Sequence, residues 1–297
     1  MLSWLSLSQS KYYYWKRRKG KENQHNGKTV PKSHWLLPWE TKAILDYRAE
    51  NMREGYRRLA YRMLDEDIVC ASPSSVYRVL RDADLLLKKW RHKKAKGSGF
   101  KQPTTVHRHW HLDITYINFK GTFVYLVALI DGFSRFIVHH EVRTSVESLD
   151  IEIMLERALL RHHPKQKPVL ITDNGPQMIS KEFKKYLSLV DITHRTTRFY
   201  YPQSNGKVER FFGTCKNEWE RINSFLTLDD LKRQLQKYID FYNYERLHSS
   251  IGYITPFAMM RGKQNEIFKE RKVKLAKARE ARKLEHSNHQ GLLCLAQ

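Results

Sequence analysis

Three apolar runs with strand-like alternation constrain the fold of this chain more than any other part of its sequence. They span residues 109–118, 122–130 and 135–143, with Lys120-Gly121 at the first turn and Asp131-Gly132 before the third run. Short turns between alternating runs are typical of β-hairpins. The three runs therefore predict an antiparallel meander.

Helical and strand-like segments alternate after this meander. Their periodicity predicts helices at about 147–161, at 180–189, from Glu209 to about 222 and at 228–243, and strands at 168–172 and 191–195. Antiparallel strands followed by alternating helices and strands are expected to form one mixed sheet with helices packed on it. The fold class is therefore α/β, and the order of elements resembles that of a ribonuclease H-like core.

Three acidic residues occupy positions in this pattern from which their side chains can converge. Asp113 lies within the first strand, Asp173 directly follows the strand at 168–172, and Glu209 opens a helix after the turn-rich stretch 202–206. Carboxylates are suited to hard divalent cations such as Mg²⁺. Two such ions about 4 Å apart suit phosphodiester cleavage or transfer. These three acids are the candidate catalytic and metal-binding residues.

The charge balance indicates a polyanionic partner. The 297 residues include 54 Lys and Arg against 31 Asp and Glu, a net charge of +23 that favours nucleic acid over a neutral small molecule. Three widely separated cysteines predict neither a CxxC metal site nor a disulfide framework. This cysteine pattern suits a reduced, cytoplasmic setting, and because no apolar run reaches the roughly 18 residues of a membrane span, we expect no membrane partner.

Composition divides the chain into five parts. A basic arm at 1–38 is followed by a helical module at 39–90, a basic linker at 91–105, the core at 106–262 and a basic tail at 263–297. The tail consists mostly of strong helix formers, and a helix there could lie on DNA or a partner. It lacks the sustained apolar heptads of a zipper, which favours a frayed, solvated helix.

The helical module has the signals of a helix-turn-helix. Ser72 can cap its third helix, with Pro73 in the first turn. Facing outward, that helix would present Ser74, Ser75, Arg78 and Arg81 to DNA. A purely structural three-helix bundle is the alternative.

Histidines precede Asp113 on the same strand face. His107, His109 and His111 alternate with it in an H-x-H-x-D pattern that also suggests a metallo-hydrolase. Ile114 stands where dinuclear zinc hydrolases have a further histidine, and no Cys/His set with zinc spacing accompanies the pattern. The histidines are therefore expected to support packing or to contact DNA.

The phrases HWHLDITYI, VLITDNGPQ and YYPQSNGKVERFFGTCKNE, which surround the three acids, resemble those of retroviral-integrase-like DDE transposases of bacterial insertion sequences, OrfB type. The likeness extends upstream to residues 55–58 and 76–78, and downstream to a block at 242–256. It implies a ribonuclease H-like integrase core preceded by a helix-turn-helix. It also implies that the acids bind two Mg²⁺ or Mn²⁺ ions, and that the enzyme cuts transposon ends and joins a 3′-hydroxyl to a new phosphodiester.

Residues for DNA contact follow from position and from the resemblance. Lys216 lies two helical turns after Glu209 on nearly the same face, and it matches a lysine assigned to DNA contact in related integrases. Gln203 and Asn205 precede the Glu209 helix in a polar loop, for which a plain surface loop is the alternative. Arg57, Arg78 and Arg81 of the helical module are the other candidates, whereas Arg246 and His248 suit either DNA contact or the core.

The implied reaction also suggests partners. Two DNA ends must be held together, which implies at least a homodimer on DNA, and the resemblance implies an OrfA-type partner from an upstream frame. Two other functions stay open, namely an inactive DNA-binding regulator derived from a transposase and a ribonuclease acting on hybrid duplexes. The presence of all three acids argues against the regulator.

Overall fold

The computed structural model describes residues 8–20, 35–87, 102–196, 205–220 and 224–295. The chain divides into two units, one made of Met1–Leu37 with Arg279–Gln297 and the other of Pro38–Ala278. The first contains α1 (Gln9–Arg17). The second contains the sheet and the helical module. None of the helices in the described ranges is long and apolar enough to cross a membrane.

A five-stranded mixed sheet forms the centre of the second unit, in the order β3-β2-β1-β4-β5. The strands are β1 (His109–Phe119), β2 (Thr122–Asp131), β3 (Ile137–Arg143), β4 (Val169–Thr172) and β5 (His194–Thr196). The first three are antiparallel, whereas β4 and β5 run parallel to β1. The predicted meander and mixed sheet are confirmed, and the strand order is that of a ribonuclease H-like fold.

The turn between β1 and β2 explains why the meander could be predicted from the sequence. Lys120 and Gly121 both have positive φ, 49° and 80°, and a two-residue turn of this kind matches the twist of the strands that it joins. Glycine adopts this conformation without steric cost. The alternation of the flanking strands then places one set of side chains on each face of the sheet.

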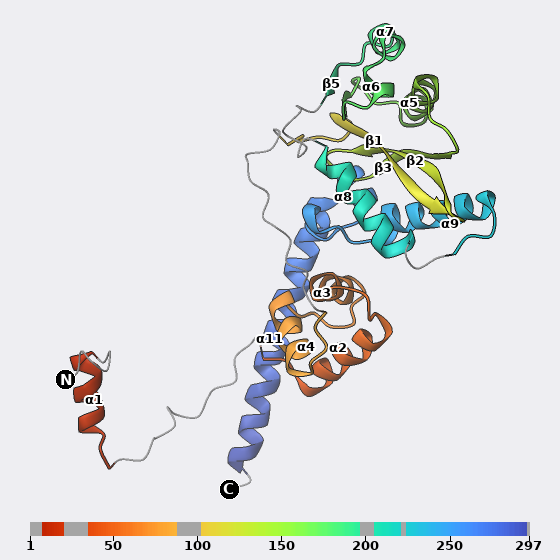
Figure 1. The fold of residues 1–297 in the computed structure, drawn as a ribbon. Coiled ribbons are helices and arrows are strands. Elements are labelled where there is room, and N and C mark those ends of the chain that lie inside the picture. The colour runs from red at the N-terminus through yellow and green to blue at the C-terminus, as the bar shows by residue number, and fades with distance from the viewer. Residues whose placement is uncertain (1–7, 21–34, 88–101, 197–204, 221–223, 296–297) are drawn as a thin grey trace. The chain divides into compact units, whose positions relative to one another are not determined.

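Helices cover both faces (Figure 1). On one face lie α5 (Ser148–His162), α6 (Pro176–Ile179) and α7 (Lys181–Leu189), packed on Trp110, Leu112 and Leu129. On the other lie α8 (Gly206–Cys215) and α9 (Leu228–Asp240), packed on Ile117, Leu126 and Ile130. Burial of these two apolar layers is the main stabilising contribution to the core.

Two of the expected helices end in π-helical turns. The helix that contains Glu209 continues from α8 into η2 (Lys216–Glu220), and α9 continues into η3 (Phe241–Glu245). A π turn carries an extra residue and so redirects the side chains that follow it. Within η2, Trp219 is buried in the apolar layer while Glu218 contacts Arg246.

The helical module consists of α2 (Pro38–Glu50), α3 (Tyr56–Asp65) and α4 (Pro73–Asp82). The predicted cap is confirmed, because the Ser75 N–H donates to the Ser72 hydroxyl at 3.2 Å and Pro73 begins the helix. The expectation that Ser75 faces outward is wrong. Its side chain is 4 % exposed, with its hydroxyl 3.1 Å from that of Ser72, so the cap draws it inward.

The basic tail is more ordered than expected. After η4 (Ser249–Ile251) and α10 (Pro256–Met260), the chain forms one continuous helix, α11 (Gln264–Leu295), instead of a frayed one. Arg271 on this helix is buried and donates to both carboxylate oxygens of Asp65, at the end of α3, at 2.7 and 2.6 Å. The first part of the tail is therefore attached to the helical module.

Candidate catalytic site and nucleic-acid interface

Asp113 and Asp173 occupy corresponding positions on neighbouring parallel strands. The register pairs His109 with Val169 and His111 with Ile171. Continued by two residues, this register places Asp173, the first residue after β4, beside Asp113. The Gly175 N–H donates to Asp173 Oδ1 at 3.0 Å, and a Cβ at Gly175 would lie only 3.1 Å from that oxygen. A glycine at this turn therefore allows the carboxylate its close approach to the backbone.

The charge of Asp173 acts on both of the other predicted acids, Asp113 and Glu209. Burial is the main reason that the pKa of Asp113 is raised to about 7; the charges of Asp173 and Glu209 raise it further, against the lowering effect of the Ile114 N–H, which donates at 2.9 Å. Burial and the charge of Asp173 also raise the pKa of Glu209. Such charge effects act over a short range. The structure thus brings these three acids into one neighbourhood.

The acids do not form a closed ligand cage. Within the described ranges, no three His, Cys, Asp or Glu side chains gather closely enough to hold a metal ion. Asp173 is held by its own turn and Glu209 is exposed. The donor chemistry nevertheless fits a divalent cation, since three neighbouring carboxyl groups, two of which have a raised pKa, would be stabilised by a positive charge between them.

The start of the Glu209 helix is fixed to the central strand. Asn205 immediately precedes α8, and its side-chain amide donates to the Leu112 carbonyl, next to Asp113, at 3.2 Å. The Asn205 side chain is 1 % exposed, so from this position it offers no atom to DNA. Gln203, the other predicted contact of this loop, lies outside the described residues.

Lys216 lies near the central strand, at the point where α8 passes into the π turn. Its Nζ is 4.7 Å from the centre of the Tyr116 ring, a cation–π contact, and the side chain is partly exposed. Tyr116 is on β1, after Asp113. Lys216 therefore remains available at the surface on the same helical run as Glu209.

The three candidate arginines of the helical module are exposed. Arg78 donates to the Ser75 hydroxyl at 3.3 Å, and Arg81 donates to the neighbouring Asp82 carboxylate at 2.9 and 2.7 Å. Arg57 lies 5.5 Å from the ring centre of Tyr56.

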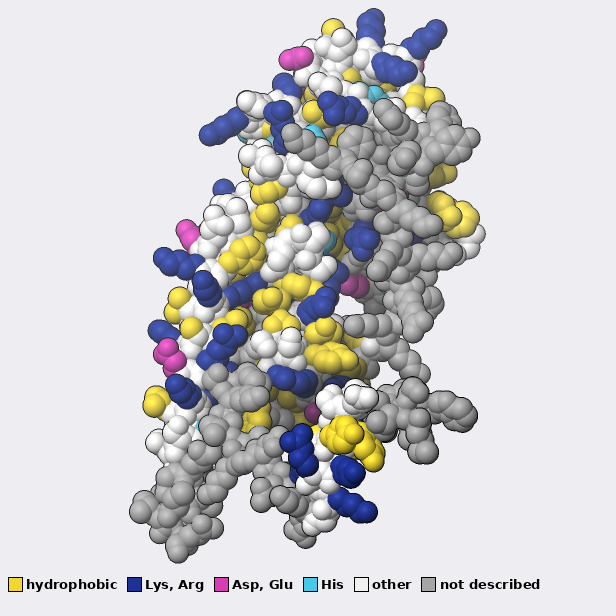
Figure 2. Space-filling model, turned by 90° about the vertical axis from the view of Figure 1, so that its left-hand side faces the viewer, with side chains coloured by type: hydrophobic (Ala, Val, Ile, Leu, Met, Phe, Trp, Pro, Cys, Tyr) yellow, Lys and Arg dark blue, Asp and Glu magenta, His cyan; other side chains and the backbone are white. Residues whose placement is uncertain are grey.

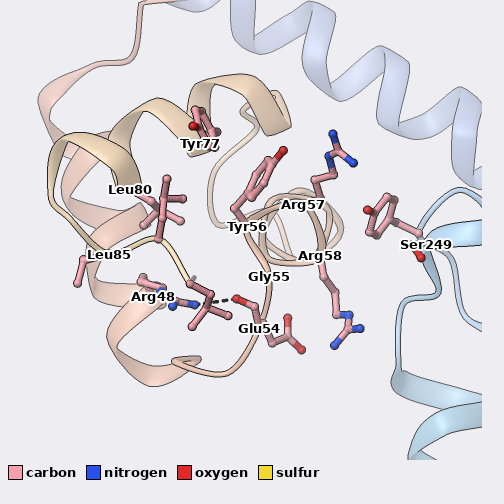
Figure 3. Close-up of a pocket in the computed structure, with 13 residues that line it drawn as sticks. Arg48, Glu54, Gly55, Tyr56, Arg57, Arg58, Tyr77, Leu80, Leu85 and Ser249 are labelled. Carbon is pink, nitrogen blue, oxygen red and sulfur yellow. Dashed lines mark hydrogen bonds between the residues drawn. The ribbon is translucent and has the colours of Figure 1, made fainter. Parts of the chain in front are cut away.

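A cavity of about 570 Å³ lies beside Arg57 (Figure 3). Tyr56 and Tyr77 face it from α3 and α4, with ring centres 5.1 Å apart, and Arg57 lines it as well. Arg48 is engaged within the module, because its guanidinium donates to the Glu54 carbonyl at 2.7 Å. Helix α4 keeps Arg78 and Arg81 at the surface, as a DNA-contacting helix requires.

Two of the three histidines before Asp113, His107 and His111, support packing. The His107 N–H donates to Asp131 at 2.7 Å, and its Nδ1 accepts from the Trp110 indole at 3.1 Å. His111 is buried, and burial is the first cause that lowers its pKa to about 3. A neutral, buried imidazole here agrees with the packing role expected from the sequence.

Two charged residues, Lys207 and Glu218, were not predicted from the sequence. Lys207, in the first turn of α8, has its pKa lowered to about 7, chiefly by burial and also by the charge of Arg135. Glu218 forms a two-point ion pair with Arg246, whose Nε and Nη2 donate at 2.6 and 2.7 Å, which settles Arg246 as a core residue in this structure. No local sequence pattern indicates either residue, because Arg135, which acts on Lys207, and Arg246, which pairs with Glu218, are both remote in sequence.

A mixed sheet with one aspartate within its central strand, a second at the end of the neighbouring parallel strand and a glutamate on a following helix is the arrangement of an integrase-type catalytic core, a DDE-type polynucleotidyl transferase. Two family models, both described as integrase core domain, match residues 103–202 and 190–256.

Relatives carry the identification further. The transposase for insertion sequence element IS904 of Lactococcus lactis is 29% identical over 178 residues, covering 57% of this chain and 70% of the relative. The putative transposase InsK for insertion sequence element IS150 of Escherichia coli is 26% identical over 222 residues, covering 71% and 78%. The chain belongs to the DDE transposases of insertion sequences that carry an integrase-like core.

Among solved structures, the chain is similar to one in the intasome of simian T-cell lymphotropic virus. That similarity has a TM-score of 0.49 and 21% identity, covering 73% of this chain and 74% of the other. The fold assignment rests instead on the strand order and the register of the sheet.

Proposed function

We propose that this transposase cuts and joins DNA at Asp113, Asp173 and Glu209, and that these residues hold two divalent cations there. The observation that carries the proposal is that the charge of Asp173 raises the pKa of both Asp113 and Glu209, because this effect requires the three carboxylates to lie close together. Relatives named as transposases for insertion sequences support the reaction class. The parallel register of β1 and β4 supports the shared position of the two aspartates.

Mg²⁺ or Mn²⁺ ions, when bound, would activate the attacking oxygen and stabilise the leaving oxygen of an in-line displacement. The chain's own task is to hold and align the ligands. Asp113 supplies a carboxylate from within β1, Asp173 one from the end of β4, and Glu209 one from the first turn of α8. Asn205 supports this alignment by fixing the start of α8 to the Leu112 carbonyl.

DNA contact is proposed for Lys216 beside the acids and for Arg57, Arg78 and Arg81 in the helical module. Lys and Arg side chains are spread over the face seen in Figure 2, where acidic side chains are few. This distribution agrees with the net charge of +23. Gln203 stays a prediction. Synapsis of two ends would require at least a homodimer, and an OrfA-type partner would contribute to the recognition of those ends.

Strand cleavage and joining test the proposal directly. The substrate is an oligonucleotide duplex carrying the parent element's terminal repeat, with Mg²⁺ or Mn²⁺. Removing a group that merely supports a metal ligand costs about 10–100-fold, so Glu209→Gln, which removes a ligand charge, should lower joining by more than about 100-fold. Binding of the same duplex should stay within about twofold, because Glu209 contributes no positive charge to DNA.

Glu245→Gln is the matched control, since Glu245 is an exposed acid on η3. It should cleave and join like the wild type. Unchanged cleavage and joining in Glu209→Gln would contradict the proposed site. Binding without nuclease or joining activity under any divalent ion would instead identify an inactive DNA-binding regulator.

A further inference from the structure

Three large aromatic side chains lie uncovered on one face of the β1–β2 hairpin. Tyr116, Phe123 and Tyr125 are 58 %, 57 % and 38 % exposed. Tyr116 is directly opposite Tyr125 in the antiparallel register, and the rings of Tyr116 and Phe123 meet edge to face with centres 5.1 Å apart. We refer to these three residues as the aromatic platform.

The aromatic platform begins where the helical cover of this face ends. Leu112 and Val127, on the same face but nearer the start of β1, are buried in the layer with α5 and α7. The last β4 partner of β1 is His111, so in the described chain the edge of β1 beyond Asp113 has no paired strand. Clustered exposed aromatics beside an open strand edge mark an interaction surface, whereas single exposed apolar residues do not.

The positive charge of Lys216 favours a nucleic-acid strand over an apolar protein face as the partner of the aromatic platform. Lys216 lies over the Tyr116 ring, and within the described residues it forms no ion pair with a carboxylate. Arg143, opposite Tyr125 on β3, is neutralised by Glu141 and Asp150 at 2.7 and 2.6 Å. An unpaired cation on an aromatic surface suits a strand with bases to stack and phosphates to neutralise. An apolar protein face would have to desolvate that cation.

The aromatic platform is also within reach of the acids. Tyr116 is three residues beyond Asp113, about 10 Å along the strand, and its side chain lies on the opposite face of the sheet across the open edge of β1. Lys216 is seven residues beyond Glu209, about 10 Å along a helix. Both distances correspond to about three nucleotides of stacked DNA. A strand that leaves the acids can therefore pass over the open edge of β1 to the aromatic platform.

We propose that the aromatic platform binds the bases of an unpaired DNA strand next to the reacting phosphodiester, with Lys216 on its phosphate. This inference rests on the proposed function, because it takes the three acids as the point of reaction. It adds the form of the substrate, which is a DNA end whose last few base pairs are opened. Stacking on tyrosine and phenylalanine rings tolerates any base, so the aromatic platform would contribute affinity without reading sequence.

A forked duplex with about three unpaired nucleotides, carrying 2-aminopurine in the tail, tests the inference against a blunt duplex of the same sequence. The full-length wild type should bind the fork more tightly and quench the tail's fluorescence. Loss of one base–aromatic stack should make Tyr116→Leu bind the fork about tenfold more weakly, with little change for the blunt duplex. Tyr116→Phe keeps the ring and should behave like the wild type.

Two further variants keep the test sharp. Leu189→Ala removes an exposed apolar side chain from the end of α7 and should change neither binding nor fluorescence. Tyr125→Leu repeats the loss of a ring at a second position of the aromatic platform and should also weaken fork binding. Thermal unfolding checks that each variant is folded.

Equal losses for fork and blunt duplex, or unchanged fluorescence in Tyr116→Leu, would overturn the inference. A change in self-association of the free protein without a change in fork binding would overturn it as well, and would assign the surface to a second copy. Glu209→Gln separates the two proposals, since it should quench the tail like the wild type while failing to join DNA. Should that variant join DNA normally, the catalytic assignment fails whatever the tail's fluorescence shows.

Discussion

His248 is a buried base in a cluster of arginines. It is 8 % exposed, and its Nδ1 accepts from the Ser250 N–H at 3.2 Å. Burial, and then the charges of Arg246 and Arg135, lower its pKa to about 3. The folded state therefore holds the imidazole neutral across the pH range in which an unfolded chain protonates it.

The sign of the resulting pH dependence follows from this depressed pKa. The stabilisation is fully present above the unfolded value near pH 6.5 and is lost as pH falls from there toward 3. Between pH 7 and pH 5, His248 should cost the wild type about 2 kcal/mol of unfolding free energy. In His248→Asn the amide oxygen can accept from Ser250 without titrating, so the variant should lose about 2 kcal/mol less than the wild type over the same interval.

Urea unfolding at pH 7 and pH 5 measures both proteins. All other titrating groups are shared, so the difference between the two losses reports on His248. Equal losses in wild type and variant would show that the imidazole is protonated without penalty in the folded state.

At the scale of single residues, the sequence predicted the positions of the acidic side chains better than it predicted which polar side chains are buried. Asp113 and Asp173 were placed by the strand pattern, because the position of a residue within a strand or directly after it is set by local alternation whatever packs nearby. Asn205 and Ser75 were expected at the surface because their types are polar. Both are buried through hydrogen bonds, Asn205 to the remote Leu112 and Ser75 to the cap residue, and polarity alone does not indicate such partners.

At the scale of elements, the π turn η2 carries Glu218, which forms an ion pair with the buried Arg246. Arg246 is buried, and it is matched by Glu218, whose two oxygens accept from it. Arg58 of α3 approaches the same carboxylate at 3.6 Å. One acid therefore balances two guanidinium groups, and its removal leaves a buried positive charge without compensation.

Glu218→Gln should therefore lower the unfolding free energy by about 3 kcal/mol. The matched control is Arg233→Ala, which removes an exposed ion pair with Asp230 and should cost less than about 1 kcal/mol. Denaturant unfolding at neutral pH gives both values. Similar small losses for the two variants would mean that Arg246 is stabilised by its surroundings without Glu218.

The strands and most helices were predictable as elements because their periodicity is local. The meander, α5 and α7 begin and end within a few residues of the expected positions. The π turns were not predictable, since their sequences have ordinary helical periodicity and the extra residue is set by the packing of Trp219 and Tyr242.

At the scale of the whole molecule, Arg271 ties the start of α11 to both the helical module and the core. Its guanidinium donates to Asp65 and also to the backbone carbonyls of Gly252 and Tyr253, at 3.0 and 2.7 Å. The Tyr253 ring stacks on that of Tyr61 with centres 5.0 Å apart. The buried Arg271 side chain therefore connects α11 to the end of α3 and to the turn at residues 252–253.

Arg271→Met should separate the unfolding of the helical module from that of the core. The methionine retains the apolar stem but leaves Asp65 and two carbonyls without their donor, at a cost of about 3 kcal/mol. Calorimetry should show one transition for the wild type and two for the variant. A single transition in the variant, shifted or not, would show that other contacts couple the two parts. Lys272→Met, at an exposed position of the same helix, is the control and should unfold like the wild type.

The pairing of His109 with Val169 has a consequence for the life of the chain in the cell. The strand that carries Asp113 is synthesised long before its parallel neighbour, and α8 with Glu209 follows later still. Contacts between such distant segments form slowly. A nascent chain therefore emerges from the ribosome with an incomplete set of the three acids, and the full set is present only when synthesis of the core is nearly finished.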